Sequence, residues 1–313
     1  MACPVYLFTG FLDSGKTTLI KDTLNDEQFM DGISRTLIIC FEQGETEYTN
    51  EFLDKHNAFI ELLDASTQLT VEKMHELDTL YHPDQVFIEY NGSESVSETL
   101  LTGMPDYWPL VEILTTVDAS TFPVYISNMR SLMFEQLRWS DVVICNRCTP
   151  DTSGSLLRGN IKAINKRAQI FYEGNFGEPV ELKNGLLPFD VNSEIIDVKD
   201  DDYGLWYMDA ADNPDKYNGK KVILRGMYAE DLPGYKQTFI LGRRVMVCCE
   251  ADTSLCGITV TGVKIWEMEK GMWVQVEGTL KELPVENGGK TLVLYADKIQ
   301  HYNGPADPFV YFS

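Results

Sequence analysis

Short apolar runs alternate with longer amphipathic segments through the first 173 residues of the chain. Most of these runs carry apolar residues on both faces, which is typical of buried parallel strands. The runs expected to form strands are 4–9, 36–41, 58–63, 85–90, 111–118, 141–146 and 169–172. Apolar residues at helical spacing predict helices that end near Asn25 and that span 66–81, 121–139 and 155–166. Strands that alternate with helices predict an α/β fold, a parallel sheet wrapped by helices.

The pattern changes after residue 173. Glycines and prolines become frequent between 174 and 203 and lead into the acidic run Asp200–Asp202, which indicates a linker. Beyond it, turn signals separate five expected strands, at 221–228, 238–249, 256–263, 272–280 and 291–299. This spacing predicts a small all-β barrel of the OB type. The expected domains are therefore 1–180, a linker at 181–204 and a barrel at 205–313, with an apolar tail at 308–312 that docks on its own barrel or on another subunit.

The charge of the chain restricts its partners. Its 313 residues include 48 acidic and 26 basic side chains, a formal net charge of −22. This charge argues against nucleic acid and against an anionic membrane surface, because their phosphates would be repelled. No apolar run approaches the length of a membrane-spanning helix. Seven cysteines, an odd number spread over a long chain, argue against a disulfide framework and favour the reducing cytoplasm.

The first expected strand leads directly into Gly10-Phe11-Leu12-Asp13-Ser14-Gly15-Lys16-Thr17-Thr18. This G-x-x-x-x-G-K-T pattern between a strand and a helix predicts a phosphate-binding loop. The two glycines let main-chain N–H groups point at phosphate oxygens, and the N-terminus of the helix adds a favourable dipole. We expect Lys16 to reach the β and γ phosphates and Thr17 to ligate Mg²⁺. The expected phosphate-binding set is Gly10, Asp13, Ser14, Gly15, Lys16, Thr17 and Thr18.

Acidic and polar residues follow the other strands. Glu42 and Glu45 lie in a polar turn, Glu89 ends a strand with Gly92 three residues later, and Asn146 ends another. Ligands of such folds bind where the carboxyl ends of the strands meet, so we expect these residues at one edge. Glu42 and Glu89 are expected with Thr17 at the metal, and Gly92 at the γ-phosphate. Lys16, Glu45 and Glu89 form the expected catalytic set, with either Glu45 or Glu89 orienting water, and Asn146 contacts the base.

Together these segments resemble the CobW-type nucleotide-binding domain, a family related to the GTPases that help load nickel into urease and hydrogenase. The matching pieces are the loop 10–18, Glu42-x-Gly44-Glu45, Ile88-Glu89-x-x-Gly92, Val117-Asp118-Ala119, Gln136 before Ser140-Asp141-Val142, and Ile161-x-Ala163-Ile164-Asn165 through Ile170. The resemblance implies GTP hydrolysis linked to metal trafficking, often of zinc or cobalt. It also implies a client metalloprotein or a metal ion as partner, and Zn²⁺ as a candidate second cofactor beside Mg²⁺ and GTP or ATP. An oligomer is compatible with it.

The chain departs from the family pattern at two places, which concern the recognition of the base and the binding of zinc. The family reads guanine with Asn-Lys-x-Asp, whereas this chain has Asn146-Arg147-Cys148-Thr149, and a threonine hydroxyl cannot make the charged bidentate contact. Either Asp151 takes the place of the missing aspartate from a shifted loop, or the preference for one base is relaxed. GTP is favoured over ATP. The family also carries a Cys-x-Cys-Cys motif, but the corresponding stretch 62–67 has no cysteine. Tight Zn²⁺ binding is not expected there.

The remaining cysteines and the barrel residues offer weaker signals. Cys145 and Cys148 are expected in the core and the base loop, whereas Cys248, Cys249 and Cys256 could share a metal or thiol function only across a bulge. Arg243-Arg244 and Trp273 would suit a nucleic-acid face, which the acidity of the chain disfavours. The second half resembles the C-terminal domain of a bacterial family found beside membrane permeases. The matching segments are Leu232-Pro233-Gly234-Tyr235, Phe239-x-x-Gly242-Arg243 and Cys248-Cys249-x-Ala251-Asp252.

The sequence favours a slow nucleotide switch in which triphosphate orders the turn Glu42–Glu47 and so gates the barrel or a client. One alternative is a nucleotide-dependent adaptor that binds but barely hydrolyses. Another is a small-molecule kinase, which needs an acceptor pocket and mobile arginines, and the segments near the loop have few of these.

Overall fold

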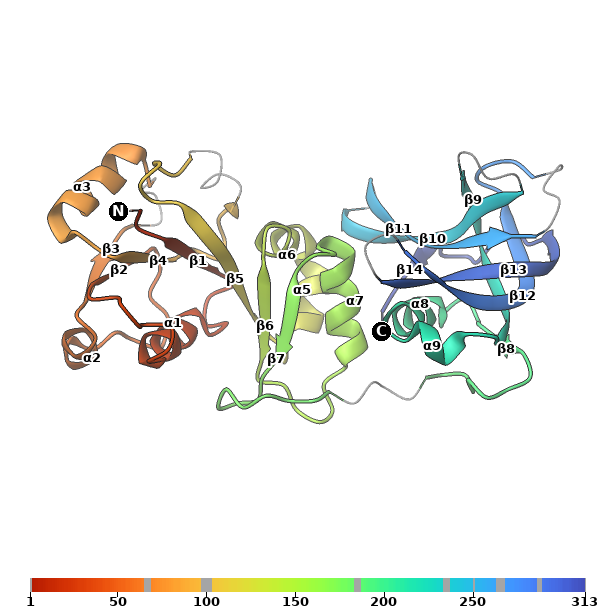
Figure 1. The fold of residues 1–313 in the computed structure, drawn as a ribbon, viewed down its shortest axis with the longest axis horizontal. Coiled ribbons are helices and arrows are strands. Elements are labelled where there is room, and N and C mark those ends of the chain that lie inside the picture. The colour runs from red at the N-terminus through yellow and green to blue at the C-terminus, as the bar shows by residue number, and fades with distance from the viewer. Residues whose placement is uncertain are drawn as a thin grey trace. The chain divides into compact units, whose positions relative to one another are not determined.

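The structure of the protein, a computed structural model, describes residues 2–64, 69–96, 103–182, 187–232, 237–249, 251–262, 268–285 and 289–312. It divides into two compact units, one of residues 1–152 with 164–183 and one of residues 153–163 with 184–313 (Figure 1). The division near residue 183 falls inside the linker expected at 181–204. Among the expected turns, 233–234 and 287–288 lie outside the described residues, as do residues 65–67 of the cysteine-free stretch 62–67.

The first unit is built on a seven-stranded sheet in which every neighbouring pair is parallel, which confirms the predicted α/β fold. Its strands are β1 (Val5–Thr9), β2 (Thr36–Cys40), β3 (Ala58–Leu62), β4 (Gln85–Glu89), β5 (Leu110–Asp118), β6 (Val142–Asn146) and β7 (Gln169–Tyr172). Their order is β3-β2-β4-β1-β5-β6-β7. Because β1 lies between β4 and β5, the loop that follows β1 starts at the middle of the carboxyl edge.

Apolar clusters on both faces of this sheet explain why its strands are apolar throughout. Leu7, Ile39 and Ile88 belong to one cluster, whereas their sequence neighbours Phe8 and Phe87 belong to the other. Successive side chains of a strand point to opposite faces, so both sets of residues are buried. The rings of Phe8 and Phe87 pack edge to face with centroids 5.2 Å apart.

Helices connect the strands. They are α1 (Lys16–Asn25), α2 (Asn50–Lys55), α3 (Val71–Tyr81), α5 (Phe122–Asn128), α6 (Arg130–Leu137) and α7 (Gly154–Ile164). The Thr70 hydroxyl accepts a hydrogen bond from the Lys73 amide, so α3 begins five residues later than expected. The single helix expected at 121–139 is instead two, because Met129 leaves the helical conformation at φ −130°. No described helix is long and apolar enough to span a membrane.

The second unit contains a closed five-stranded barrel, as the sequence predicted. The barrel strands are β9 (Lys221–Asp231), β10 (Thr238–Cys249), β11 (Asp252–Thr261), β12 (Trp273–Pro284) and β13 (Lys290–His301). Two short strands, β8 (Ile196–Asp197) and β14 (Phe309–Val310), pair with strands of the barrel. The ring closes in the order β9-β10-β11-β13-β12-β9. All neighbours in it are antiparallel except β11 and β13, which gives the crossed-over five-strand barrel of the OB type.

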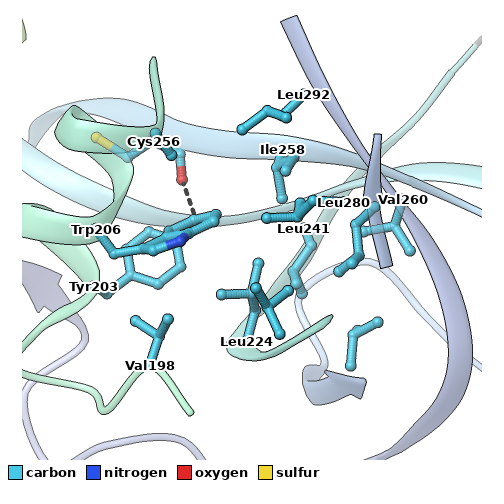
Figure 2. Packing of buried hydrophobic residues seen from close by; sticks show 14 of the residues in the cluster. Val198, Tyr203, Trp206, Leu224, Leu241, Cys256, Ile258, Val260, Leu280 and Leu292 are labelled. Atoms are coloured by element: carbon cyan, nitrogen blue, oxygen red, sulfur yellow. Dashed lines mark hydrogen bonds between the residues drawn. The ribbon is translucent and has the colours of Figure 1, made fainter. Parts of the chain in front are cut away.

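Two short helices, α8 (Tyr203–Asp212) and α9 (Pro214–Tyr217), precede the barrel and were not expected from the sequence. Trp206 and Tyr203 on α8 are buried in the barrel core, and the Tyr203 hydroxyl donates to the Cys256 carbonyl at 3.0 Å (Figure 2). Ahead of α8, β8 pairs with β9. The apolar spacing Tyr203, Trp206, Ala210 is the signal for this helix, and the acidic run before it concealed that spacing.

The C-terminal tail docks on its own unit, one of the two expected partners. β14 pairs with β10, and Val310 and Phe312 join the barrel core.

Arg243, only 2% exposed, donates to the Asp200 carbonyl at 2.7 Å. Its guanidinium carbon lies 5.5 Å from the ring centroids of both Tyr203 and Trp273. Arg243 therefore ties the barrel together internally and is not part of a basic surface for nucleic acid.

Phe312→Ala is expected to lower the free energy of unfolding by about 3 kcal/mol, because it removes a ring that is only 2% exposed. Urea unfolding followed by tryptophan fluorescence measures this loss. Tyr311→Ala is the control, since Tyr311 is 49% exposed and its loss should change stability by no more than about 1 kcal/mol. Equal losses in the two variants would show that the tail is not docked as described.

Candidate functional site

The loop after β1 turns sharply before α1 begins. Gly10, Asp13 and Gly15 have φ values of 129°, 57° and 106°, all in the range that favours glycine. A Cβ on Gly15 would lie 2.5 Å from the Asn146 amide nitrogen, so the position is closed to larger residues. The loop therefore has the tight, glycine-dependent course from which main-chain amides can surround an anion at the start of α1.

Lys16 is the most constrained charged group of the site. Its side chain is only 3% exposed, and the ammonium donates to the carbonyl oxygens of Gly10 at 2.8 Å and Phe11 at 3.0 Å. Its third contact is an ion pair of 2.5 Å with Glu42 Oε1. All three ammonium protons are thereby used, and the charge is neutralised by a residue from the turn after β2.

The same oxygen of Glu42 accepts a second hydrogen bond. The Gly92 amide, three residues after β4, donates to Glu42 Oε1 at 3.4 Å. Lys16 and the Gly92 amide are the two donors that the sequence assigns to the γ-phosphate. In this structure one carboxylate oxygen binds both of them, as a phosphoryl oxygen would.

Behind this contact, Glu89 at the end of β4 is 2% exposed and accepts hydrogen bonds on both carboxylate oxygens. The Thr17 hydroxyl donates to Oε1 at 2.5 Å, and the Tyr48 hydroxyl donates to Oε2 at 2.6 Å. Burial and the neighbouring Glu89 charge raise the pKa of Tyr48, so its hydroxyl remains a donor at physiological pH. Sequence reasoning missed Tyr48, although an aromatic residue at the end of the polar run 42–47 is a signal for an anchored turn.

Hydroxyl and carboxylate oxygens suit a hard divalent cation. The site residues that line one small hollow are Asp13, Gly15, Lys16, Thr17, Thr18, Glu42, Glu45 and Glu89, with Leu12, Gly44, Thr46 and Arg147 beside them. Mg²⁺ prefers such oxygen ligands, often one or two carboxylates together with substrate phosphates. Thr17, Glu42 and Glu89 fit this chemistry, whereas among the described residues no group of three or more His, Cys, Asp and Glu side chains is arranged to hold a metal ion.

Two loop side chains already have hydrogen-bond partners within the protein. The Asp13 carboxylate accepts the Glu45 amide at 3.0 Å, so it holds the turn after β2 against the loop. The Ser14 hydroxyl is 2.6 Å from the Thr116 hydroxyl on β5. These two residues can therefore contribute main-chain amides rather than side chains, and the Glu45 carboxylate is exposed at the outer wall.

The side chain of Gln136 on α6 holds the start of the phosphate loop by hydrogen bonds. Its side chain is buried, and its oxygen accepts the Gly10 amide at 3.2 Å and the Thr9 hydroxyl, while its nitrogen donates to the Glu94 carbonyl at 3.0 Å. On the β4 side, a Cβ at Gly92 would collide with the Gly10 carbonyl. Gln136 and the close approach of Gly92 therefore link the phosphate loop to α6 and to the segment that follows β4.

The base loop at the end of β6 also contacts the phosphate loop. The Asn146 amide donates to the Ser14 carbonyl at 2.6 Å, and Arg147 contacts the Asp118 carboxylate at 2.5 Å and the Asp13 carbonyl at 3.0 Å. Burial alone would raise the pKa of Asp118, but hydrogen bonds from Ser120 and the Arg147 guanidinium lower it below its ordinary value. This ion pair fixes Arg147 beside the loop.

Among the residues whose side chains the structure describes, the cysteines form no cluster of metal ligands. Cys145 is buried and Cys148 donates to its carbonyl at 3.2 Å, and burial raises the pKa of both thiols, as expected for core residues. The bulge that the cysteines of β10 would need does occur, between Met246 and Cys249. However, Cys249 is opposite Asp252 while Cys256 is opposite Arg243, so Cys256 lies well along the ladder from the other two.

Comparisons with known proteins match both halves of the chain. A family model described as the CobW/HypB/UreG nucleotide-binding domain matches residues 4–172, and the DUF1980 C-terminal domain matches residues 181–312. A zinc-regulated GTPase metalloprotein activator of Dictyostelium discoideum is 24% identical over 243 residues, which are 61% of this chain and 50% of that protein. The chain therefore spans about half the length of this curated relative.

Two solved structures are also similar. The Zn(II)-bound YjiA GTPase of E. coli is 16% identical, covers 98% of this chain and 92% of its own, and has a TM-score of 0.44. The hydrogenase maturation factor HypB of Archaeoglobus fulgidus is 17% identical, covers 57% and 84%, and has a TM-score of 0.41.

Tyr48→Phe is expected to lower the free energy of unfolding by about 1–2 kcal/mol, because a buried oxygen of Glu89 loses its hydroxyl donor and keeps only the long contact with the Cys40 thiol. Urea unfolding measures the change. Tyr81→Phe is a matched control, since it removes a hydroxyl that donates to Glu61 at 2.9 Å in a more exposed place. The account of the Glu89 site would be wrong if Tyr81→Phe cost as much as Tyr48→Phe.

Proposed function

The chain belongs to the CobW/HypB/UreG nucleotide-binding family, and from this premise we propose that it binds GTP with Mg²⁺ and hydrolyses it slowly as a switch. The observation that carries the proposal is the position of Glu42, whose one oxygen binds both Lys16 and the Gly92 amide. A triphosphate that enters the loop must replace this carboxylate, because the buried ammonium has no other proton to donate. Nucleotide binding is then coupled to movement of the turn 42–48.

Glu89 and Glu45 are proposed to have different roles. Glu89 is held by two hydroxyls, which suits a residue that orients Thr17 at the metal shell. Mg²⁺, when bound, would neutralise charge on the β and γ phosphates. Glu45 has an exposed carboxylate on the wall of the same hollow, and we assign to it the orientation of the attacking water.

We place the activity in metal homeostasis, with a metalloprotein client as partner. The Dictyostelium relative is named a metalloprotein activator regulated by zinc. Since the described residues hold no cluster of metal ligands, we propose that any Zn²⁺ is carried mainly by the client. Cys3, Cys40, Cys145 and Cys148 are thiols outside any disulfide, which supports a place in the cytoplasm.

A second candidate is a nucleotide-dependent adaptor that barely hydrolyses. The observation in its favour is that both oxygens of Glu89 are occupied by hydroxyl donors, which leaves this buried carboxylate poorly placed to activate water. Phosphate release measured with GTP, Mg²⁺ and added client separates the two. The adaptor predicts a nucleotide-dependent shift in melting temperature without phosphate release.

Lys16→Ala is expected to weaken GTP binding by at least about tenfold, because it removes a charge-assisted contact to phosphate. Titration with a fluorescent GTP analogue measures this, and thermal melting reports whether the fold is retained. Lys21→Ala on the same helix is the control, since Lys21 lies at the surface and donates to the Glu47 carbonyl. Unchanged affinity in Lys16→Ala would contradict the proposed function.

Glu42→Gln is expected to bind GTP about tenfold more tightly when Mg²⁺ is chelated, because an uncharged amide competes less well for Lys16. The same fluorescent titration, performed with EDTA, measures the change. Glu47→Gln is the control, because this exposed residue of the same turn does not touch Lys16. Weaker binding in Glu42→Gln would show that Glu42 does not occupy the place of a phosphate oxygen.

A further inference from the structure

The base loop of this chain lacks the acidic residue that would distinguish guanine from adenine. Guanine presents two donors side by side, the N1–H and the exocyclic amine, and a carboxylate accepts both. Thr149 stands at the position where the family pattern has an aspartate. In the structure the Thr149 amide and hydroxyl are directed to the Thr152 hydroxyl, at 2.8 and 3.3 Å, so this residue closes its own turn.

A different carboxylate is held next to this loop by the sheet. Glu173 follows β7, whose Tyr172 is the parallel neighbour of Cys145 on β6. The Cys148 amide donates to the Glu173 carbonyl at 2.8 Å, and the Glu173 amide donates to the Cys145 carbonyl at 2.9 Å. Main-chain hydrogen bonds therefore hold Glu173 directly beside Cys148, on the same edge of the sheet as Asn146.

The carboxylate of Glu173 is half-buried and surrounded by like charge. Burial raises the pKa of Glu173, and the nearby carboxylates of Asp22 and Glu178 raise it further. Within the described part of the chain, no hydrogen bond or ion pair to this carboxylate is found. Burial of a carboxylate without hydrogen-bond donors is costly. Neutral donors of a ligand therefore stabilise this carboxylate more than they would stabilise one that water already solvates.

We propose that Glu173 selects the base of the bound nucleotide, with its carboxylate accepting the N1–H and the exocyclic amine of guanine. This assignment rests on the proposed function. Adenine would be rejected because its N1 is an acceptor, which a carboxylate repels. Glu173 thereby supplies, from the loop after β7, the charge that Thr149 lacks in the loop after β6.

Asp151 is the competing candidate for the same role. It lies two residues beyond Thr149 on an exposed turn. The main chain of Glu173, unlike that of Asp151, is hydrogen-bonded on both sides to the base-loop segment 145–148. Asp151→Asn therefore belongs in the same experiment, where it is expected to leave base selection unchanged.

The test is competition of unlabelled GTP, XTP and ATP against a fluorescent guanine nucleotide on the full chain. Glu173→Gln is expected to weaken the binding of GTP by about 100-fold relative to that of ATP. It is also expected to strengthen the binding of XTP, since an amide can donate to the extra carbonyl of xanthine. Glu178→Gln is the matched control, because the Glu178 carboxylate accepts the Phe176 amide at 2.9 Å and is occupied locally. Glu173→Asp keeps the charge with a shorter reach, and should retain the order GTP before XTP.

The outcomes separate this inference from the function on which it rests. A wild-type ratio of GTP to XTP affinity in a folded Glu173→Gln overturns the role of Glu173, and a changed ratio in Asp151→Asn assigns that role to Asp151. Both results leave GTP binding itself intact. If the wild-type protein bound none of the three nucleotides, the proposed function would be overturned together with this inference.

Discussion

The buried ammonium of Lys16 is the constraint on which the site depends. A charge removed from water must be matched by acceptors, and here these are two carbonyls of the loop and the carboxylate of Glu42. One lysine thus connects the loop after β1 with the turn after β2, and Glu42 extends the connection to Gly92 after β4. The contacts that neutralise the charge also hold three separate segments together.

The parallel sheet explains why these segments can meet. With β1 in the middle, the ends of β4 and β5 flank the phosphate loop, β2 delivers Glu42 from one side, and β6 delivers Asn146 from the other. In the proposed function, a nucleotide extends along this edge, with its phosphates near Glu42 and Glu89 and its base towards β6 and β7. The turn 42–48 is attached to the edge at Lys16, Asp13 and Glu89, so a ligand that displaces Glu42 changes a segment fixed at three points.

Much of this arrangement could be predicted from local patterns. The strand, loop and helix around Gly10–Thr18, the residues at strand ends and the barrel strands all follow from spacing and residue type. The roles of Tyr48 and Gln136, and the role proposed for Glu173, could not be assigned from spacing, because they depend on contacts between segments far apart in the chain. Likewise, Arg243 looks like a surface charge in the sequence, and only the packing of Tyr203 and Trp273 around it shows that it is internal.

A crystal structure of the protein with Mg²⁺ and a non-hydrolysable GTP analogue tests the central claim most directly. The quantity to measure is the distance between Lys16 Nζ and the nearest Glu42 oxygen, which is 2.5 Å in the structure described here. The account predicts that this ion pair is broken, with Lys16 and the Gly92 amide both bound to a phosphoryl oxygen. An intact ion pair with the triphosphate in the loop would contradict it.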